Sequence, residues 1–214
     1  MIEDSFLHMG LRRKLVDQVR SKGISDQRIL DAMLKIPRHA FMDSSFLKFA
    51  YQDQAFPISS GQTISQPYTV AFQTWLIELQ IHQKVLEVGT GSGYQAAILA
   101  ELDVRVYTIE RIRKLYQEAQ LIHRELGYQV KFFLGDGNQG LPTYAPFDRI
   151  LITAATPSIP EALKQQLIIG GILVAPVGQG ENQIMTKCVR TGTDSFVTTT
   201  HGNFIFVPMK TGLE

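Results

Sequence analysis

The sequence is poor in several features that mark particular classes of protein. Its 214 residues include one cysteine, Cys188, so no disulfide can form within the chain, as expected for the reducing cytoplasm. The formal net charge is +1, which gives no broad positive field to attract nucleic acid or an anionic membrane. The mainly apolar run at residues 167–178 is too short to span a bilayer, and the acidic start, Met1–Asp4, lacks the apolar core of a secretory leader. We therefore expect a cytoplasmic protein that binds neither nucleic acid nor membrane.

Motifs for metal binding and for nucleophilic catalysis are also missing. The five histidines show no paired ligand spacing, so we expect no metal site. No G-x-S-x-G segment is present to form a nucleophile elbow. The length and a hydrophobic content of 44% fit one globular domain over residues 1–214. Because no segment indicates an obligate interface, we expect a monomer.

The strongest positive pattern is the stretch from Val85 to Ala100. The stretch starts with a β-branched apolar run. A turn with glycine at every second position follows, and then a helical pattern rich in alanine and leucine. Glycines at positions 89, 91 and 93 let the backbone turn sharply and approach a ligand closely. We expect the following helix to present free backbone N–H groups at its start. This strand–turn–helix unit predicts a nucleotide or nucleoside site.

Two details of this stretch separate the ligand classes. A dinucleotide fingerprint reads G-x-G-x-x-G, whereas the spacing here is G-x-G-x-G and position 94 holds tyrosine. Glu87, two residues before the first glycine, disfavours a pyrophosphate and suits a positively charged ligand. S-adenosylmethionine carries a sulfonium and an ammonium and no phosphate, so the pattern favours it as the cofactor. An NAD(P)-dependent oxidoreductase and a non-catalytic protein that binds the methyl donor remain the alternatives.

Three acids are expected at the carboxyl ends of three successive strands: Glu87, Glu110 and Asp136. The carboxyl ends of parallel strands converge on one crevice, so these side chains can face one ligand. Glu110 follows the glycine turn by about twenty residues, the spacing at which an acid can bind a ribose diol. Asp136 lies between two glycines and can accept a hydrogen bond from the exocyclic amine of a purine.

The order of elements predicts the fold class. Strands and helices alternate from Lys84 onward, including a helix over 160–168 and a strand over 172–177. This alternation predicts an α/β fold with a doubly wound, mostly parallel, Rossmann-like sheet and helices on both faces. Two extended runs near the end predict an antiparallel hairpin. We assign residues 1–50 to an N-terminal helical flank, 51–67 to an active-site loop, 84–178 to a cofactor-binding core and 183–207 to the C-terminal hairpin.

The stretch from Tyr51 to Pro67 has no clean period and is rich in hydroxyl and amide side chains. A long irregular connection inside a compact domain is usually a binding loop or a linker, and the apolar residues here argue against disorder. Helical spacing resumes at Tyr68, so Ser65 lies close to a helix N-terminus. At such a place the serine can either cap the helix or face an anion, and the pattern leaves both readings open.

Several segments together resemble the protein-L-isoaspartate O-methyltransferases, from about residue 10 to the end. The segments are Gly61–Tyr68, Val85–Ala97, Ile109–Arg111, Gly135–Gly137, Ala145–Asp148, Pro176–Gly178 and Phe206–Pro208. The glycine turn occurs in many methyltransferases, whereas Gly-Gln-Thr-Ile-Ser-Gln-Pro is specific to this family. The chain departs from the family pattern just before this segment. The family often has Pro-Ile-Gly there, whereas this chain has Pro57-Ile58 followed by Ser59-Ser60. A serine replacing a glycine with positive φ would be strained.

The resemblance implies methyl transfer from S-adenosylmethionine to the free carboxylate of an L-isoaspartyl residue in a damaged protein or peptide. The ester would then collapse through a succinimide, which begins repair. By the same resemblance, Ser65 is the catalytic residue and contacts the substrate with Thr63, Ile64 and Val207. The implied cofactor-binding residues are Glu87, Gly89, Thr90, Gly91, Ser92, Gly93, Glu110, Arg111, Asp136 and Gly137. A methyltransferase acting on a small molecule is the alternative within this chemistry.

The chemistry also fits elementary considerations. A carboxylate is already ionised at neutral pH, so it needs no general base. What remains is alignment of the reacting atoms, and such positioning contributes about 7–11 kcal/mol at the high end. We expect Ser65 to donate a hydrogen bond that aims the carboxylate.

Overall fold

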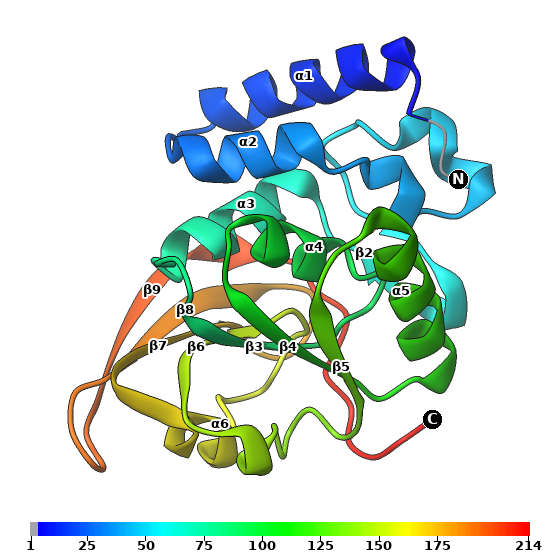
Figure 1. Cartoon of the computed structure of the whole chain (residues 1–214). Coiled ribbons are helices and arrows are strands. Elements are labelled where there is room, and N and C mark those ends of the chain that lie inside the picture. The colour runs from blue at the N-terminus through cyan, green and yellow to red at the C-terminus, as the bar shows by residue number, and fades with distance from the viewer. Residues whose placement is uncertain (1–3) are drawn as a thin grey trace.

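The computed structural model describes residues 4–214 and contains a central sheet with helices on both faces (Figure 1). Met1–Glu3 and the expectation that concerns a leader lie outside this range. Within residues 4–214 the sheet has seven strands in the order β5-β4-β3-β6-β7-β8-β9. The strands are β3 (Lys84–Val88), β4 (Arg105–Glu110), β5 (Val130–Leu134), β6 (Phe147–Ile152), β7 (Leu167–Val177), β8 (Gln183–Arg190) and β9 (Phe196–Phe204).

The pairing of these strands confirms the predicted fold class. Neighbouring strands in the run β5-β4-β3-β6-β7 pair in parallel, and β8 and β9 add an antiparallel hairpin at one edge. The helices are α1 (Phe6–Ser21), α2 (Gln27–Lys35), α3 (Pro67–Leu76), α4 (Tyr94–Glu101), α5 (Arg113–Leu126) and the short α6 (Glu161–Gln165). Figure 1 shows α3 and α4 on one face of the sheet and α6 on the other. In this part of the chain no helix is long and apolar enough to cross a membrane.

Side chains that alternate along β3 divide the core into two layers. Val85 packs into the cluster that includes α1 to α4, whereas Leu86 packs on the opposite face with Phe147 and Leu163. This is the expected behaviour of a central parallel strand, which is buried on both faces. Glu87 faces the same side as Val85 because side chains alternate with period two. The strand therefore carries one acid into an apolar layer.

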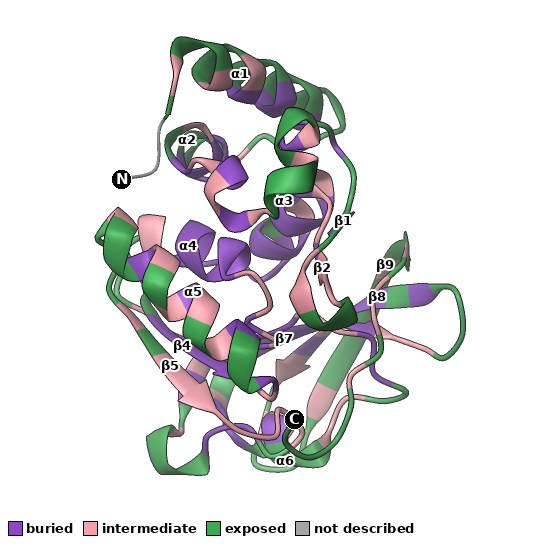
Figure 2. Cartoon of the chain, turned by 90° about the vertical axis from the view of Figure 1, so that its right-hand side faces the viewer, coloured by how far each residue is buried: buried purple, intermediate pink, exposed green. Residues whose placement is uncertain are grey.

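The N-terminal helices pack onto the same core. α1 begins at a capping box between Ser5 and His8, and α2 is capped by Asp26. Their buried side chains, with Val16 and Met33 among them, belong to one cluster with the residues of α4. Figure 2 shows that α4 is buried almost throughout and that α1 exposes its outer side. Both helices lie within residues 1–50, the range in which the sequence predicts a helical flank.

The prediction for residues 160–168 was partly wrong. The helix α6 ends at Gln165 and β7 begins at Leu167, whereas the sequence indicated a helix to residue 168 and a strand from residue 172. Arg190 on the neighbouring strand donates hydrogen bonds to the carbonyls of Gln165 and Leu167, at 3.0 and 2.6 Å. Leu167 also pairs with Phe147 in the sheet. Contacts that are distant in sequence therefore end the helix early.

Candidate active site

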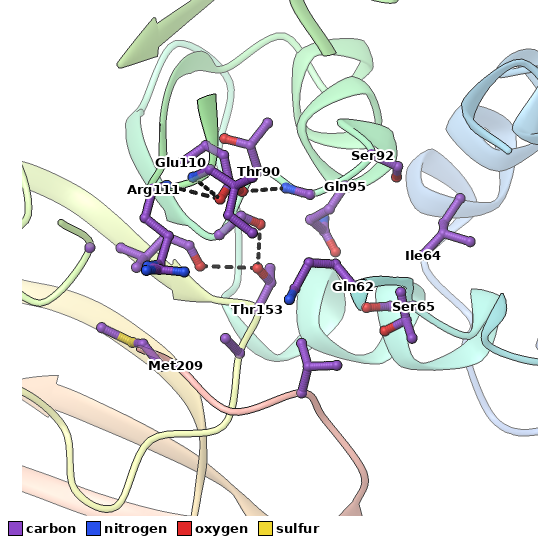
Figure 3. Close-up of a pocket in the computed structure, with 18 of the residues that line it drawn as sticks. Gln62, Ile64, Ser65, Thr90, Ser92, Gln95, Glu110, Arg111, Thr153 and Met209 are labelled. Carbon is purple, nitrogen blue, oxygen red and sulfur yellow. Dashed lines mark hydrogen bonds between the residues drawn. The ribbon is translucent and has the colours of Figure 1, made fainter. Parts of the chain in front are cut away.

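The carboxyl ends of β3, β4 and β6 border a cavity with about 850 Å³ of empty space, part of it open to solvent (Figure 3). We call it the main cavity. Its walls come from the glycine turn, from the loop before α3, from the ends of β4 and β6, and from the segment after β9. It is lined by residues 62–65, 88–92, 109–112, 153–154 and 207–210 together with Val70, Tyr94, Gln95 and Gly137. The site therefore lies at the sheet edge that the sequence predicts.

The glycine turn needs glycine for two physical reasons. Gly89, Gly91 and Gly93 have φ angles of 99°, 53° and 87°, in the left-handed region. A Cβ at Gly89 would lie 2.6 Å from the Thr153 Oγ1 atom. That hydroxyl donates to the Gly89 carbonyl at 2.6 Å, so β6 holds the turn in place.

The backbone N–H groups of this turn are mostly bonded within the protein. The N–H of Gly89 donates to the Ile109 carbonyl at 2.9 Å, and that of Gly93 donates to the Thr90 carbonyl at 2.8 Å. The N–H of Gly91 donates to Glu110 Oε2 at 2.9 Å. At the start of α4 the N–H of Tyr94 donates to Ser92 Oγ at 3.3 Å. The bonds of Gly89, Gly91 and Gly93 hold the turn itself in shape, and the donors predicted at the helix start belong to the residues that follow it.

Glu110 is held at the cavity wall by the backbone. Its carboxylate accepts hydrogen bonds from the N–H groups of Gly91, Arg111 and Ile112, at 2.9, 2.8 and 3.0 Å. The residue is 5% exposed and lines the main cavity. A carboxylate has about four acceptor sites, so capacity remains for hydroxyl donors from a ligand. This arrangement fits the ribose of a nucleoside, as the spacing predicts.

Glu87 lies behind the cavity wall rather than on it, in contrast to the direct contact expected from the sequence. Its side chain is fully buried, and it is absent from the cavity lining. The Thr108 hydroxyl donates to Glu87 Oε2 at 2.5 Å. Burial raises the pKa of Glu87 to about 8, the hydrogen bond from Thr108 opposes the rise, and the negative Glu110 adds to it.

Asp136 is not among the residues that line the main cavity. Its carboxylate accepts hydrogen bonds from the N–H groups of Asn138 and Gly212, at 2.9 and 2.8 Å. Burial works against ionisation, but these hydrogen bonds prevail and lower the pKa of Asp136. Asp136 thus holds the C-terminal segment against the site. Its neighbour Gly137 does line the cavity, and a Cβ there would lie 2.5 Å from Val88 Cγ1.

The other predicted residues are distributed as follows. The main cavity is lined by Thr63, Ile64, Ser65, Gly89, Thr90, Gly91, Ser92, Glu110, Arg111, Gly137 and Val207. Gly93 is not among the lining residues, and it shapes the turn from behind, against His123. The His123 Nε2 atom lies 2.9 Å from the Gly93 carbonyl oxygen.

Ser65 lies on the wall between the main cavity and a second hollow, which we call the outer groove. The outer groove is lined by Asp53, Gln54, Ala55, Thr63, Ser65, Gln66, Tyr68, Thr69, Phe72 and residues 201–206. Figure 3 shows Ser65 on the opposite side of the main cavity from Glu110. Within the described chain, no hydrogen bond is made by the Ser65 hydroxyl. The residue is therefore available to ligands from both sides.

The start of α3 decides whether Ser65 caps this helix. The N-cap is Gln66, so Ser65 is not the capping residue. The Asp53 carboxylate accepts from the Tyr68 N–H at 2.7 Å, and Lys22 pairs with Asp53 at 2.5 Å. The Asp53 carboxylate therefore occupies the Tyr68 N–H, and this donor of α3 is not free for a ligand.

The sequence missed several residues of the main cavity. Thr153 and Ala154 follow directly after β6. The rule that ligands bind at the carboxyl ends of parallel strands, which pointed to Glu110, could also have found them. Met209 and Lys210 follow the hairpin and reach the site through the pairing of Pro208 with Ala155, which no local pattern reveals.

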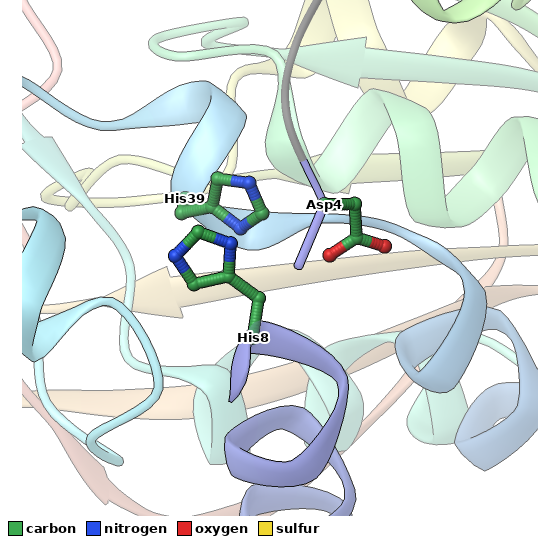
Figure 4. Close-up of side chains that lie close together, drawn as sticks. All are labelled: Asp4, His8 and His39. Carbon is green, nitrogen blue, oxygen red and sulfur yellow. The ribbon is translucent and has the colours of Figure 1, made fainter. Parts of the chain in front are cut away.

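Away from the main cavity, Asp4, His8 and His39 place one potential ligand atom each within 4.8 Å of the others (Figure 4). The Asp4 carboxylate already pairs with the buried Arg12 at 2.8 Å, and the two imidazole rings stack at 4.0 Å. The guanidinium would repel a cation, so the cluster is better explained as a contact that fastens the start of α1 to η1 (Arg38–Phe41).

Comparisons with known proteins agree with this geometry. The family model "Protein-L-isoaspartate(D-aspartate) O-methyltransferase" matches residues 11–214. A protein-L-isoaspartate O-methyltransferase of Flavobacterium psychrophilum is 52% identical over 209 residues, which are 97% of this chain and 98% of the relative. One of Cytophaga hutchinsonii is 50% identical over 208 residues, 97% of this chain and 94% of the relative.

Solved structures share the fold. A structure named protein-L-isoaspartate O-methyltransferase has a TM-score of 0.86 at 29% identity and covers 94% of this chain and 67% of its own. A second, from Plasmodium falciparum in complex with S-adenosyl-L-homocysteine, has a TM-score of 0.81 at 22% identity, with 93% and 98% covered. Together with the family model and the relatives, these findings show that the chain belongs to the protein-L-isoaspartate(D-aspartate) O-methyltransferase family.

Proposed function

We propose that this protein transfers a methyl group from S-adenosylmethionine to the free carboxylate of L-isoaspartyl residues in damaged proteins or peptides, and so initiates repair through a succinimide. Membership of the family and about 50% identity to its curated members support this activity. The observation that carries it is the position of Ser65, which borders both the main cavity and the outer groove. One hydroxyl can therefore address a cofactor on one side and an acceptor on the other.

The residues of the main cavity fit S-adenosylmethionine, which would supply a methyl group activated by its positively charged sulfur. Glu110 has acceptor capacity for the ribose, and the turn from Gly89 to Gly93 allows close approach of the ligand. The buried Glu87 lies behind this wall, and one of its oxygens lacks a hydrogen-bond partner among the described residues. Arg111 and Gly137 complete the lining near Glu110.

Asp136 stays in the proposed binding set. Its carboxylate accepts hydrogen bonds from Asn138 and Gly212, and one of about four acceptor sites remains for the amino group of an adenine. Thr90 and Ser92 stay in the proposed binding set because both line the main cavity. Gly93 contributes through the shape of the turn.

On the acceptor side, Ser65 positions the carboxylate. The acceptor is ionised at neutral pH and needs no proton removed. A hydrogen bond from the Ser65 hydroxyl fixes the direction of the attacking oxygen, while Thr63, Ile64 and Val207 line the same cavity. The outer groove then leads away from Ser65 along aromatic side chains, of which Phe72 and Phe204 lie 5.1 Å apart between ring centroids. Such a groove suits the flanking residues of a peptide better than a small acceptor.

We further propose a monomeric, cytoplasmic enzyme whose single domain spans residues 1–214. Within it, residues 1–50 act as a helical flank, 51–67 as the active-site loop, 84–178 as the cofactor-binding core and 183–207 as the hairpin. The loop supplies Ser65, the core supplies Glu110, and the segment after β9 supplies Val207 to the same cavity. The single free cysteine, Cys188, is buried and agrees with a reducing compartment.

The test is a comparison of Ser65→Ala with the wild type. We expect Ser65→Ala to lose most of the turnover of an isoaspartyl peptide while the calorimetric affinity for S-adenosylhomocysteine changes less than threefold. Ser195→Ala, in the exposed turn between β8 and β9, is the matched control and should behave as wild type. A large loss of cofactor affinity in Ser65→Ala would instead place this residue in the donor site.

A further inference from the structure

Glu87 is an acid in an unusual position, at the centre of the sheet. It is paired in register with Thr108 on β4 and with Leu151 on β6, and its side chain is fully buried. Its Oε1 atom has no hydrogen-bond partner within the described chain. An ionised carboxylate with an unpaired buried oxygen is costly, so its charge state depends strongly on nearby charge.

A chain of hydroxyl groups connects this acid with the main cavity. The Thr108 hydroxyl donates to Glu87 Oε2 at 2.5 Å, and the Thr90 and Thr108 hydroxyls lie 2.6 Å apart. Thr90 in turn lines the main cavity. Each hydroxyl both donates and accepts, so the chain can reverse its direction and pass a proton either way.

Few charged groups face Glu87. From β4 the negative Glu110 acts on it, and it disfavours a second negative charge. β6 presents Leu151. The buried polar side chains of α3 and α4 are all uncharged: Thr69, Gln73, Thr74 and Gln95. The titratable residues of these two helices are Tyr68, Tyr94 and Glu101.

We propose that Glu87 exchanges one proton with solvent through Thr108 and Thr90 according to the charge of the ligand in the main cavity. Glu87 holds the proton when no cation is bound, and it releases the proton to solvent when a sulfonium is bound. This inference rests on the proposed function, because the methyl donor supplies the cation. The raised pKa of Glu87, about 8, places the exchange in the neutral range.

The consequence is discrimination between methyl donor and product. Transfer of the methyl group to a carboxylate removes one positive charge from the sulfur and one negative charge from the acceptor. The remaining thioether is neutral, so Glu87 takes its proton back and the attraction that favoured the donor is lost. Glu87 is therefore a specificity-determining residue that acts through electrostatics, without contact to the ligand.

The test is isothermal titration calorimetry of the full chain at pH 7 in buffers of different ionisation enthalpy, which counts the protons released on binding. For S-adenosylmethionine we expect the wild type to release close to one proton, and for S-adenosylhomocysteine markedly fewer. Glu87→Gln should abolish this difference. Subtracting the Glu87→Gln result also removes the titration of the ligand's own amino group, which the two proteins share.

Two further variants sharpen the result. Thr108→Val removes the hydrogen bond that favours the ionised form of Glu87 and leaves the acid, so Glu87 should keep its proton more strongly and the proton count should fall. Glu181→Gln, in an exposed turn, is the matched control and should keep the wild-type count. The affinity of the wild type for S-adenosylmethionine should also rise up to tenfold for each pH unit between 6 and 8. In Glu87→Gln this dependence should be lost.

The outcomes distinguish the two proposals. Equal proton release for both ligands in the wild type overturns the role of Glu87, even if the Glu87→Gln protein fails to fold. An unchanged count in a folded Glu87→Gln protein also overturns it. Absence of any binding heat for either ligand would instead contradict the proposed function itself.

Discussion

The active-site loop contains a strained residue that offers a quantitative test of the structure. Ser60, within the short 3-10 segment η3 (Ser59–Gly61), has φ 58° and ψ 29°. In this left-handed region an L-residue other than glycine costs roughly 1–2 kcal/mol. Replacement by glycine removes this strain, and the added freedom of glycine in the unfolded chain takes back about 0.5–1 kcal/mol.

The substitution Ser60→Gly should therefore raise the free energy of unfolding by about 0.5–1 kcal/mol, which for a chain of this size corresponds to about 1–4 °C in Tm. The side chain of Ser60 makes no hydrogen bond within the described residues, so nothing is lost with it. Thermal unfolding followed by circular dichroism measures the change.

The neighbouring Ser59 provides the control. Its φ is not positive, and its hydroxyl donates to Glu118 on α5 at 2.7 Å. Ser59→Gly loses that bond and gains chain entropy in the unfolded state, so we expect a destabilisation of about 1–2 kcal/mol. Equal effects of the two substitutions, or a lower Tm for Ser60→Gly, would refute the assigned backbone strain.

Three other predictions follow from buried groups. Gly93→Ala should weaken S-adenosylhomocysteine binding at least tenfold by calorimetry, because the turn needs φ 87° and the new Cβ would lie 3.0 Å from His123 Nε2; unchanged affinity would contradict the role of the turn. The free energy of unfolding should fall by up to about 1.4 kcal/mol per pH unit as the pH rises from 5 towards 8. The reason is that Glu87 keeps its proton in the folded state, whereas it has lost the proton in the unfolded state. Denaturant titrations of wild type and Glu87→Gln at several pH values should differ by this slope. Arg38 is fully buried, and two of its nitrogens lack hydrogen-bond partners within the described chain. Arg38→Met should therefore change the free energy of unfolding by less than about 1 kcal/mol. A loss of several kcal/mol would show that the contacts of Arg38 with Gln54 and with the Tyr94 ring outweigh the cost of its desolvation.

Local patterns were sufficient for much of the fold. The period of the apolar residues located β3 and α4, and the glycines between them marked a turn that the φ angles require. The strand ends identified Glu110 correctly as a wall residue of the main cavity. These features depend on neighbours in sequence, which is why the sequence reveals them.

Features that depend on distant contacts were harder to predict. The end of α6 depends on Arg190, and the orientation of Asp136 depends on the backbone of Gly212. Glu87 and Glu110 both lie at strand ends, yet one is enclosed by the sheet and its covering helices and the other reaches the wall. Glu87 pairs with Thr108 and therefore lies on the same face as Glu110, but it precedes the last residue of β3, whereas Glu110 is the last residue of β4. A position near a strand end therefore predicts proximity to the site, whereas direct contact depends on how far the residue lies from the end of its strand.

The loop before α3 also combines features that local sequence predicts with features that depend on distant contacts. Its composition predicted a binding segment, and Ser65 does border the main cavity. The sequence could not exclude that Ser65 caps α3, because the alternative cap involves Asp53, which is distant from the helix start in sequence. The outer groove combines residues near position 53 with residues 201–206, and no local pattern brings these segments together.

The most direct test of the proposed activity is methyl transfer by the purified wild type to two peptides of identical sequence, one with an L-isoaspartyl and one with a normal aspartyl residue. With S-adenosylmethionine as donor, we expect methyl ester to form on the isoaspartyl peptide at a rate at least a hundredfold above that on its twin, roughly the difference of 3 kcal/mol that one well-placed acceptor can provide. Equal rates on both peptides, or no transfer by a protein that binds the cofactor, would contradict the account.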